Sequence, residues 1–504
     1  MKKIIKVTSV ILLFAMLLPS LISCGNAEFN KLDDRGKAAY IINKTNEHYK
    51  NSLKQSGDFT CVIEGKAGGV DIKIELDGSS KRAVSDADGD KMKFVNVTTV
   101  KSQNQTGDDK KTENYTETTA FQNGFMYMGY DTDKEGSPDI RLKSALSAKD
   151  FSEFLTKSDI FPSEPNYAEI CDNVTVSSAA LGTRYVIKIT HGKDNQKDEL
   201  TRVTNELTSA FGIRFDLVNL EIEYTVDASK LVIKSAKVKY VTETPDFGDD
   251  QLRMTYEGTV NLGNPGTGDL KIDNEKDYSE TGDLRYAFLL SEKLTGLISA
   301  ERAGYTVTSK STVKSGGKTM SNSEETDVIN CGYKNGIYIY SINAKANLYG
   351  QNVEMDITYN GVQQKVDVKG APNQTTATNE IVARMFLINI LNTVLISPGE
   401  VSDVNVIGTE NGVTTVELTL VFGDRYVERL KSASLPVDLM ENRSVKITAE
   451  YDAEINVKSA SLKLSTDYEY NGQRYDVKIF TIVNAFKEGK LTGITPVKPK
   501  SIEE

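Results

Sequence analysis

One acidic segment of the chain has a spacing that could bind a cation. Asp131, Asp133 and Glu135 alternate with other residues, as ligands do in the first half of a helix–loop–helix calcium loop. The twelfth position of such a loop holds a bidentate glutamate, but here it is Leu142, and the flanking segments have no helical pattern. Solvated turns are therefore the favoured interpretation, and a calcium site at the three acidic residues is the alternative.

The residue types that most often carry catalysis are scarce. The chain has two histidines, His48 and His191, and neither has the spacing of a metal ligand. Gly316–Thr319 contains the glycine and the lysine that end a phosphate-binding loop, but Thr312 takes the place of that loop's first glycine. We therefore expect a protein that is not an enzyme and that carries no cofactor and no zinc.

The N-terminal segment predicts export. Three lysines precede the apolar run Val10–Leu18, which is too short to span a bilayer, and small Ser23 stands just before Cys24. Residues 1–23 thus have the layout of a secretory signal peptide. The end of this segment, Leu21-Ile22-Ser23-Cys24, resembles the lipobox of bacterial lipoproteins. The resemblance implies cleavage before Cys24, a diacylglyceryl group on its thiol, and a mature chain anchored on the outer face of a cell membrane. An ordinary signal peptide with a chance cysteine is the alternative.

The charge balance disfavours nucleic acid as a partner. The chain has 60 basic and 71 acidic side chains, and residues 1–23 contain three of the lysines, so the mature part carries 57 basic and 71 acidic groups. An excess of negative charge disfavours binding to nucleic acid and to anionic membrane surfaces. Acyl chains rather than charge would then hold the protein at the membrane.

Three cysteines remain after Cys24 is assigned to the lipid. Cys61, Cys171 and Cys331 are odd in number and widely spaced, which is unlike a disulfide framework. Buried free thiols are the favoured interpretation, and a disulfide between Cys61 and Cys171 is the alternative.

The elements that must position these residues are mainly strands. Alternating apolar and polar residues follow the first helix and are typical of hairpins, with Asn123-Gly124 marking a tight turn and 101–114 a mobile hairpin tip. Each half is predicted to form a helix, about four strands, a helix, a strand, a helix and three strands. In the first half the predicted helices are 37–54, 147–160 (capped by Ser147) and 196–211, and the last three strands are 215–226, 231–242 and 251–262.

After residues 263–283, which are rich in glycine and acidic residues, the pattern starts again. Gly316-Gly317 repeats Gly68-Gly69, Asn335-Gly336 repeats Asn123-Gly124, and the segment 451–460 repeats 224–236. These matches keep the same order along the chain, so we infer a duplicated domain rather than a solenoid. Chance similarity between β-rich segments is the alternative.

We therefore predict an α+β fold with two tandem domains, each a curved antiparallel sheet, or unclosed barrel, with helices covering its concave face. The layout resembles the lipoprotein-carrier superfamily of LolA/LolB-like and LppX-like proteins, and the resemblance implies that acyl chains are held between sheet and helices. It rests on element order and membrane anchoring, so no functional residue is carried over. The predicted parts are a tether (24–36), a first domain (37–262), a linker (263–283), a second domain (284–490) and a tail (491–504).

The most apolar stretch after the signal is 381–396. It has 16 residues with Arg384 among them, which is too short to span a bilayer. Its apolar residues nearly encircle a helix, so a helix buried between the sheet and its neighbours is the favoured interpretation. The alternative is that one side lines a ligand cavity. The candidate lining residues are Met385, Phe386, Leu387, Ile390 and Leu391.

Two functions fit these features. The first is a membrane-anchored extracytoplasmic protein that binds an apolar or lipid-like ligand beneath the helices of its domains. The second is a cell-envelope scaffold whose fully packed domains bind other proteins and no ligand.

Overall fold

Regular alternation of buried and exposed side chains builds the strands of this protein. In β1 (Ser52–Ala67), Phe59, Cys61 and Ile63 are buried, whereas Thr60 and Glu64 are exposed. Successive side chains of a strand point to opposite faces of a sheet, so this pattern turns one face of β1 toward the interior.

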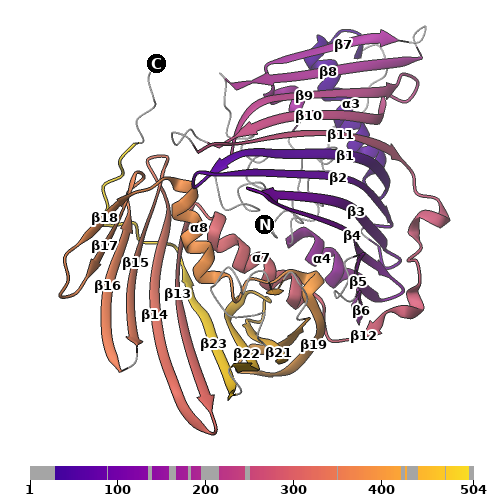
Figure 1. Ribbon diagram of the computed structural model, residues 1–504. Helices are drawn as coiled ribbons and strands as arrows, with labels where there is room; N and C mark the ends of the chain where they lie inside the picture. The colour runs from indigo at the N-terminus through magenta and orange to yellow at the C-terminus, as the bar shows by residue number, and fades with distance from the viewer. Residues whose placement is uncertain are drawn as a thin grey trace. The chain divides into compact units, whose positions relative to one another are not determined.

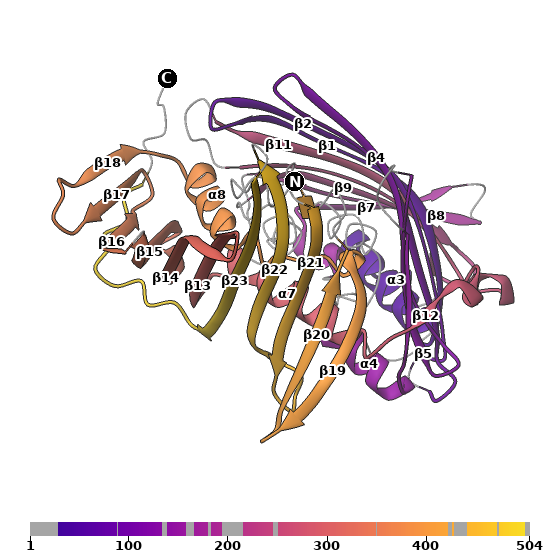
Figure 2. The same ribbon diagram turned by 60° about the horizontal axis from the view of Figure 1, so that its bottom comes forward.

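The computed structural model describes residues 29–87, 89–133, 139–157, 166–179, 183–193, 215–244, 250–348, 350–421, 426–427, 441–470 and 473–498. The chain divides into two units, residues 1–134 with 143–279, and residues 280–504 with the short segment 135–142. Each unit is built on one large sheet, and Figures 1 and 2 show its long, curved strands. The predicted helix 196–211 and the lipobox lie outside the described residues.

The first sheet has twelve strands in the order β12-β6-β5-β4-β3-β2-β1-β11-β10-β9-β8-β7 (Figure 1). Its two edges are different strands, so the sheet is open. Besides β1, its strands are β2 (Val70–Ser85), β3 (Lys93–Thr106), β4 (Asp109–Gln122), β5 (Phe125–Thr132), β6 (Ile140–Ala145), β7 (Asn173–Ala179), β8 (Arg184–Gly192), β9 (Asp216–Asp227), β10 (Val232–Glu243), β11 (Leu252–Gly263) and β12 (Ser279–Glu280).

The second sheet is also open and has eleven strands in the order β18-β17-β16-β15-β14-β13-β23-β22-β21-β20-β19. In both sheets, the first long strand of the unit pairs with the strand that follows it and with the last strand of the sheet. The two units thus share one strand order. The strands are β13 (Arg302–Ser315), β14 (Lys318–Lys334), β15 (Ile337–Leu348), β16 (Gln351–Tyr359), β17 (Gln363–Val368), β18 (Gln374–Ala377), β19 (Val401–Glu410), β20 (Val413–Leu420), β21 (Glu441–Tyr451), β22 (Val457–Tyr470) and β23 (Gln473–Lys487).

Helices occupy equivalent places in the two units. In each unit one helix precedes the first long strand, and another follows the sixth. The helices of the first unit are α3 (Asp34–Tyr49), α4 (Ala148–Lys157) and α5 (Tyr167–Ile170), and those of the second are α7 (Arg285–Ser299) and α8 (Glu380–Leu391). Single 3-10 turns are η4 (Thr267–Leu270), η5 (Glu275–Asp277) and η6 (Pro398–Glu400).

Hydrogen bonds hold α3 against its own sheet (Figure 1). The Oγ1 atom of Thr45 accepts a hydrogen bond of 2.9 Å from the backbone N–H of Ile233 in β10. A carboxylate oxygen of Asp34 accepts one of 3.1 Å from Val176 in β7. Arg35 donates to the backbone oxygens of Ala168, within α5, and of Cys171, the C-cap of α5. One face of the first sheet is therefore packed against α3.

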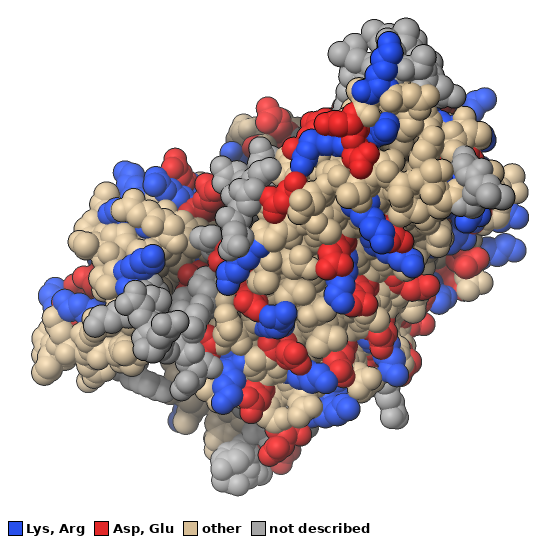
Figure 3. Space-filling view, turned by 90° about the horizontal axis from the view of Figure 1, so that it is seen from above, with Lys and Arg blue, Asp and Glu red and all other residues tan. Residues whose placement is uncertain are grey.

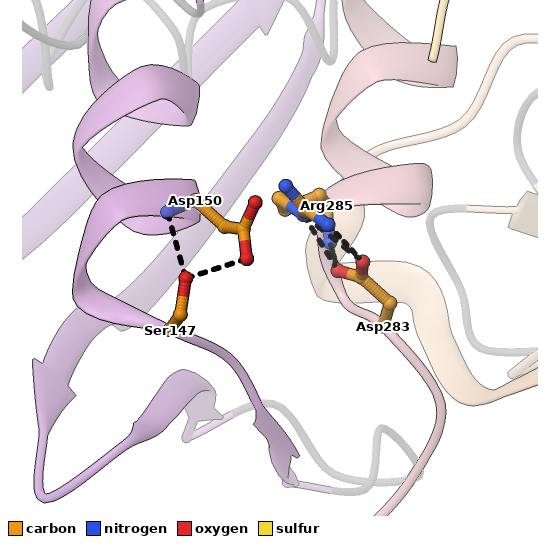
Figure 4. Close-up of polar contacts among 4 residues, drawn as sticks. All are labelled: Ser147, Asp150, Asp283 and Arg285. Carbon is orange, nitrogen blue, oxygen red and sulfur yellow. Dashed lines mark hydrogen bonds and ion pairs between the residues drawn. The ribbon is translucent and has the colours of Figure 1, made fainter. Parts of the chain in front are cut away.

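Side chains just before α4 and α7 fix where these helices begin (Figure 4). Ser147 accepts a hydrogen bond of 3.1 Å from the backbone N–H of Asp150 and donates one of 2.5 Å to its carboxylate, as the predicted cap requires. At α7, Asp283 accepts from the backbone N–H of Arg285 at 3.0 Å, and the Arg285 guanidinium donates to the same carboxylate. Both arrangements satisfy N–H groups that a helix leaves without internal partners.

Some predicted elements differ from the structure. Six strands, not about four, separate the first two helices of each unit, and the predicted mobile tip 101–114 lies mostly within β3 and β4. The predicted helix 37–54 begins and ends earlier, because the side chains from Ser52 onward alternate as in a strand. Asn335-Gly336 joins the second and third long strands of its unit, whereas Asn123-Gly124 joins the fourth and fifth, so these two turns are not equivalent.

The glycine-rich segment 263–283 is largely packed against the first sheet. Tyr278 and Ile272 are buried in a cluster with Val95, Ala120 and Tyr127. Asp269 accepts a backbone hydrogen bond from Gly266 and forms salt bridges of 3.0 and 3.3 Å with Lys54 and Lys81. The hydrogen bond first, and then the two lysines, lower the pKa of Asp269 to about 2. Composition alone does not reveal these contacts, because each involves a residue far away in the sequence.

Charged side chains of both signs are mixed on the surface. Figure 3 shows lysine and arginine side chains interspersed with aspartate and glutamate over the face in view. Ion pairs join neighbouring strands of the first sheet, with 3.1 Å between Lys188 and Glu223 and 2.5 Å between Lys239 and Glu257. On this face, the described residues form no extended basic surface.

Candidate functional site

The predicted anchor, Cys24, lies outside the described residues. Within the described part of the chain, no helix is long and apolar enough to cross a membrane.

Helix α8 carries the candidate lining residues. It begins at Asn379, whose side chain accepts a hydrogen bond of 3.0 Å from the backbone N–H of Val382 and so caps the helix. Its last residue is Leu391, and the capping box of Ser397 and Glu400 begins the next turn, η6. The helix is therefore shorter than the predicted segment 381–396.

The five candidate residues lie on two sides of α8. Leu387 and Leu391 are buried, Phe386 and Ile390 are half-buried, and Met385 is 47% exposed. Met385, Phe386 and Ile390 recur at helical spacing with half-buried Val382 and share one side of the helix. We call these four residues the α8 apolar stripe. The structure thus separates a buried side from an apolar side that protein atoms cover only in part.

Helices α7 and α8 pack on the same face of the second sheet. The Cys331 thiol lies 3.9 Å from the backbone oxygen of Leu297 in α7. Cys331 pairs across β14 and β15 with Tyr340, whose ring stacks on Phe386 of α8 at 6.4 Å between ring centres. Directly paired residues lie on the same face of a sheet, so both helices lie on the face that carries Cys331 and Tyr340. We call this the helix-side face.

A buried ionic cluster fixes α8 to that face. Arg384 is completely buried and donates a hydrogen bond of 2.8 Å from Nε to Glu380. It also donates to the Tyr333 hydroxyl at 2.6 Å and to the backbone oxygen of Ile298 at 3.1 Å. The guanidinium carbon lies 3.6 Å from the centre of the Tyr338 ring, a cation–π contact.

This cluster binds protein groups rather than leaving donors for a ligand. Burial lowers the pKa of Arg384, but Tyr333 and Glu380 outweigh burial and raise the pKa above its usual range, so the side chain stays charged. The sequence signal was an arginine within an apolar run, and its four-residue spacing from Glu380 indicates a helix ion pair. The sequence does not reveal the contacts of Arg384 with Tyr333 and Tyr338, because these tyrosines belong to β14 and β15, far from α8 in the chain.

Polar residues occupy the helix-side face beyond the helix contacts. From the Ala303–Cys331 pair, residues of β13 and β14 on this face follow in direct cross-strand pairs without a bulge. These pairs are Tyr305–Ile329, Val307–Asp327, Ser309–Glu325 and Ser311–Ser323. Six of these residues form what we call the β13–β14 polar track: Tyr305, Ser309, Ser311, Ser323, Glu325 and Asp327.

Mostly apolar side chains flank the polar track on both sides. On β23, Val483 pairs with Val307 and Ile479 pairs with Ser311, but Thr481 between them pairs with Ser309, and the two hydroxyl oxygens lie 3.3 Å apart. On β15, Ala344 pairs with Asp327, and Ala346 pairs with Glu325. The track is therefore a polar line between mainly apolar neighbours. Sequence patterns do not reveal the track, because it depends on the pairing of β13 with β14 and on which face the helices cover.

Asp327 is the most unusual residue of the track. It is 8% exposed, and its carboxyl group forms no hydrogen bond and no ion pair with a described residue. Burial raises the pKa of Asp327 to about 7, and the charge of Glu325 adds to the rise. The Tyr305 hydroxyl is also buried without a hydrogen-bond partner, and its pKa is raised well above its usual range by burial, with Cys331 and Asp327 contributing.

The other candidate residues lie elsewhere. Asp131 lies near the end of β5, and Asp133 accepts a hydrogen bond of 3.0 Å from the backbone N–H of Asn114. Glu135 lies outside the described residues. Within the described part of the chain, no group of three or more His, Cys, Asp or Glu side chains could hold a metal ion.

The three remaining cysteines are free and buried, which confirms the favoured interpretation over a disulfide between Cys61 and Cys171. Burial raises the pKa of Cys61 to about 12. A buried thiol of this kind is inert and packs as a small apolar side chain.

Comparison with known proteins gives only distant similarities. No family model matches the chain, and no curated protein matches it. Among solved structures, LprF from Mycobacterium bovis shares 11% sequence identity, covering 43% of this chain and 97% of its own, with a TM-score of 0.25. The AttH protein from Nitrosomonas europaea shares 8% identity, covering 86% of this chain and 93% of its own, with a TM-score of 0.13. Similarities of this size define neither a family nor a function.

Proposed function

We propose that this chain is an extracytoplasmic lipoprotein, anchored to a membrane through Cys24, whose second unit binds an apolar or lipid-like ligand. In this proposal, α7 and α8 cover the concave face of the second sheet, and the ligand lies between the α8 apolar stripe and the sheet. Its activity is binding rather than catalysis.

The observation that carries the proposal is the α8 apolar stripe. Met385 is exposed, and Val382, Phe386 and Ile390 are half-buried, although the opposite side of the same helix is packed into the core. Apolar surface left in water costs about 25 cal/mol per Å² relative to burial. An apolar ligand on the stripe would remove this surface from water, which is why the stripe favours a binding role over a fully packed scaffold.

A second candidate function is supported by a different observation. Strand β19 is an edge of the second sheet, and its Val406 and Ile407 side chains are both exposed. Exposed apolar side chains on an open edge favour pairing with another chain. This is the envelope scaffold expected as the alternative, and it needs no ligand.

The test compares two substitutions on opposite sides of α8. Phe386→Ala removes part of the stripe, and Leu387→Ala removes a buried side chain of the same helix. Leu387→Ala should lower the free energy of unfolding by about 2–5 kcal/mol, whereas Phe386→Ala should cost less, because its ring is only half-buried. Urea unfolding of the mature chain gives both values.

Ligand uptake is then measured with N-phenyl-1-naphthylamine, a neutral probe that fluoresces in apolar sites. We expect saturable binding to the mature chain, clearly weaker binding to the Phe386→Ala variant, and little change for Leu387→Ala when the protein is folded. If no variant shows saturable uptake, and both substitutions are strongly destabilising, the stripe is core and the scaffold function is favoured.

A further inference from the structure

The second unit contains one buried and one half-buried acidic side chain that pair with no described lysine or arginine. Asp327 and Glu325 are two residues apart on β14 and both face the helix side. Neither forms an ion pair with a described lysine or arginine, although their outward-facing neighbour Glu324 pairs with Lys310 at 2.8 Å. A buried carboxylate without a partner is costly to keep, so a stable protein normally pairs it or exposes it.

A second, independent group points to the same place. The Tyr305 hydroxyl is buried and lacks a hydrogen-bond partner. Tyr305 faces Ile329 across the strands, so it lies diagonally next to Asp327 on the same face, within reach of a long side chain. The charge of Asp327 contributes to the raised pKa of the Tyr305 hydroxyl. Two buried side chains, one with a carboxyl group and one with a hydroxyl, are thus diagonal neighbours on one face, and neither polar group has a partner among the described residues.

The surroundings indicate what kind of molecule would use these groups. Ser309, Ser311 and Ser323 continue the track with hydroxyl groups, and Ser311 and Ser323 lie 2.8 Å apart. Apolar side chains of β15 and β23 border most of the track, and the hydroxyl of Thr481 in β23 lies 3.3 Å from that of Ser309. A polar line with two negative groups inside an apolar surface suits a molecule with a cationic end and an apolar body.

The distance between the track and α8 sets the size of that molecule. Phe386 stacks on Tyr340, which is paired with Cys331, and Asp327 is four residues along β14 from Cys331. At about 3.3 Å per residue, this separation is about 13 Å along the strand. An alkyl chain of roughly ten carbons spans this length, at about 1.25 Å per bond in the extended form.

We propose that the β13–β14 polar track binds the ammonium group of an amphiphile whose apolar tail lies against the α8 apolar stripe. This inference rests on the proposed function, and it adds a charge preference that an apolar site alone does not have. Asp327 and Glu325 accept hydrogen bonds from the ammonium group, and the Tyr305 hydroxyl provides a third acceptor. Charge-assisted hydrogen bonds of this kind are about twice as strong as neutral ones.

The test displaces N-phenyl-1-naphthylamine from the mature chain at pH 8 with decylammonium, decanol and decanoate, which share one tail and differ in charge. Decylammonium should displace the probe at about tenfold lower concentration than decanol, and decanoate should be the weakest. Asp327→Asn and Glu325→Gln should each reduce the preference for decylammonium over decanol. Glu324→Gln is the matched control, because it removes the same charge from the opposite face of β14, and it should keep the full preference.

Each other outcome has a distinct meaning. Equal displacement by decylammonium and decanol overturns the inference and leaves the proposed function standing. Absence of saturable probe binding overturns both. If butylammonium, which has the same charge and a short tail, competes as well as decylammonium, the track binds free amines rather than amphiphiles. If calcium chloride abolishes the preference at concentrations that leave decanol binding unchanged, the track is a metal site and the inference is wrong.

Discussion

At the scale of single residues, Asp327 shows how position rather than residue type creates a special group. The neighbouring acidic residues of β14, Glu324 and Glu325, are exposed and half-buried, whereas Asp327 is buried, and burial raises the pKa of Asp327. Desolvation penalises the charged form of a carboxyl group, so the folded chain holds the Asp327 proton up to about pH 7. The titratable groups beside it are Glu325 on its own strand and Tyr305 on β13, and its paired neighbours, Val307 and Ala344, are apolar.

Asp327→Asn should therefore stabilise the protein at pH 8 and have little effect near pH 4. The folded-state pKa of Asp327 is raised from 3.8 to about 7, so between these values the folded chain holds a proton that the unfolded chain has released. Stability then falls as pH rises through this window, by about 1.4 kcal/mol per pH unit at most, and is flat above it. Urea unfolding of wild type and variant at pH 4, 6 and 8 measures the difference. A difference that does not grow with pH contradicts the assignment, and Glu324→Gln is the control.

At the scale of elements, a close backbone contact constrains the end of β14. Gly332 has a φ of +147°, and a Cβ atom there would lie 2.1 Å from the backbone oxygen of Glu301. The adjacent Tyr333 N–H donates a hydrogen bond of 2.7 Å to that same oxygen. This contact holds the start of β13 beside the end of β14, and it places Tyr333 next to Arg384 of α8.

Gly332→Ala should destabilise the second unit by about 1–3 kcal/mol, because the added methyl group must push the Glu301 carbonyl away from its hydrogen bond. Gly317→Asn is a suitable control. Gly317 also has a positive φ, but open space surrounds it, and asparagine tolerates this conformation. Denaturant unfolding of both variants, with the probe assay as a second readout, measures the effect. Equal stability of both variants would show that β14 can shift without cost.

At the scale of the whole molecule, the shared strand order is what a duplicated domain predicts. Both units place a helix before their first long strand and a second helix after the sixth. The polar content of the second helix differs, since α4 has charged residues where α8 is apolar. A ligand role restricted to the second unit agrees with this difference.

Cys24→Ala should release the protein from membranes or leave it unprocessed. The proposed thioether is the only strong membrane attachment that we find in the sequence, because the mature chain carries an excess of acidic groups. Fractionation of cells that express wild type and variant, with gel mobility as the readout of signal cleavage, tests this. A cleaved variant that still sediments with membranes would contradict lipid anchoring, and Cys61→Ala, which removes a buried thiol, is the control.

The sequence alone predicted much of the local structure. Period-two alternation located β9, β10 and β11 to within one or two residues, and the capping pattern of Ser147 located the start of α4. Sequence patterns of this kind work because they depend on neighbours along the chain. The predicted mobile tip 101–114 was wrong, because the polar ends of β3 and β4 carry few apolar residues in alternation, although their backbones pair along their full length.

Only the tertiary structure decided which surfaces of these elements are buried and what surrounds them. Period two tells which residues share a face of a strand, but not whether a helix or solvent covers that face. For this reason Asp327 and Glu325 looked like ordinary polar residues of a strand, whereas Arg384 looked like an exception within an apolar helix. In the structure, Arg384 is held by Glu380 and Tyr333, and Asp327 is the buried residue without a partner. The segments that meet there are far apart in the sequence, so only folding brings them together.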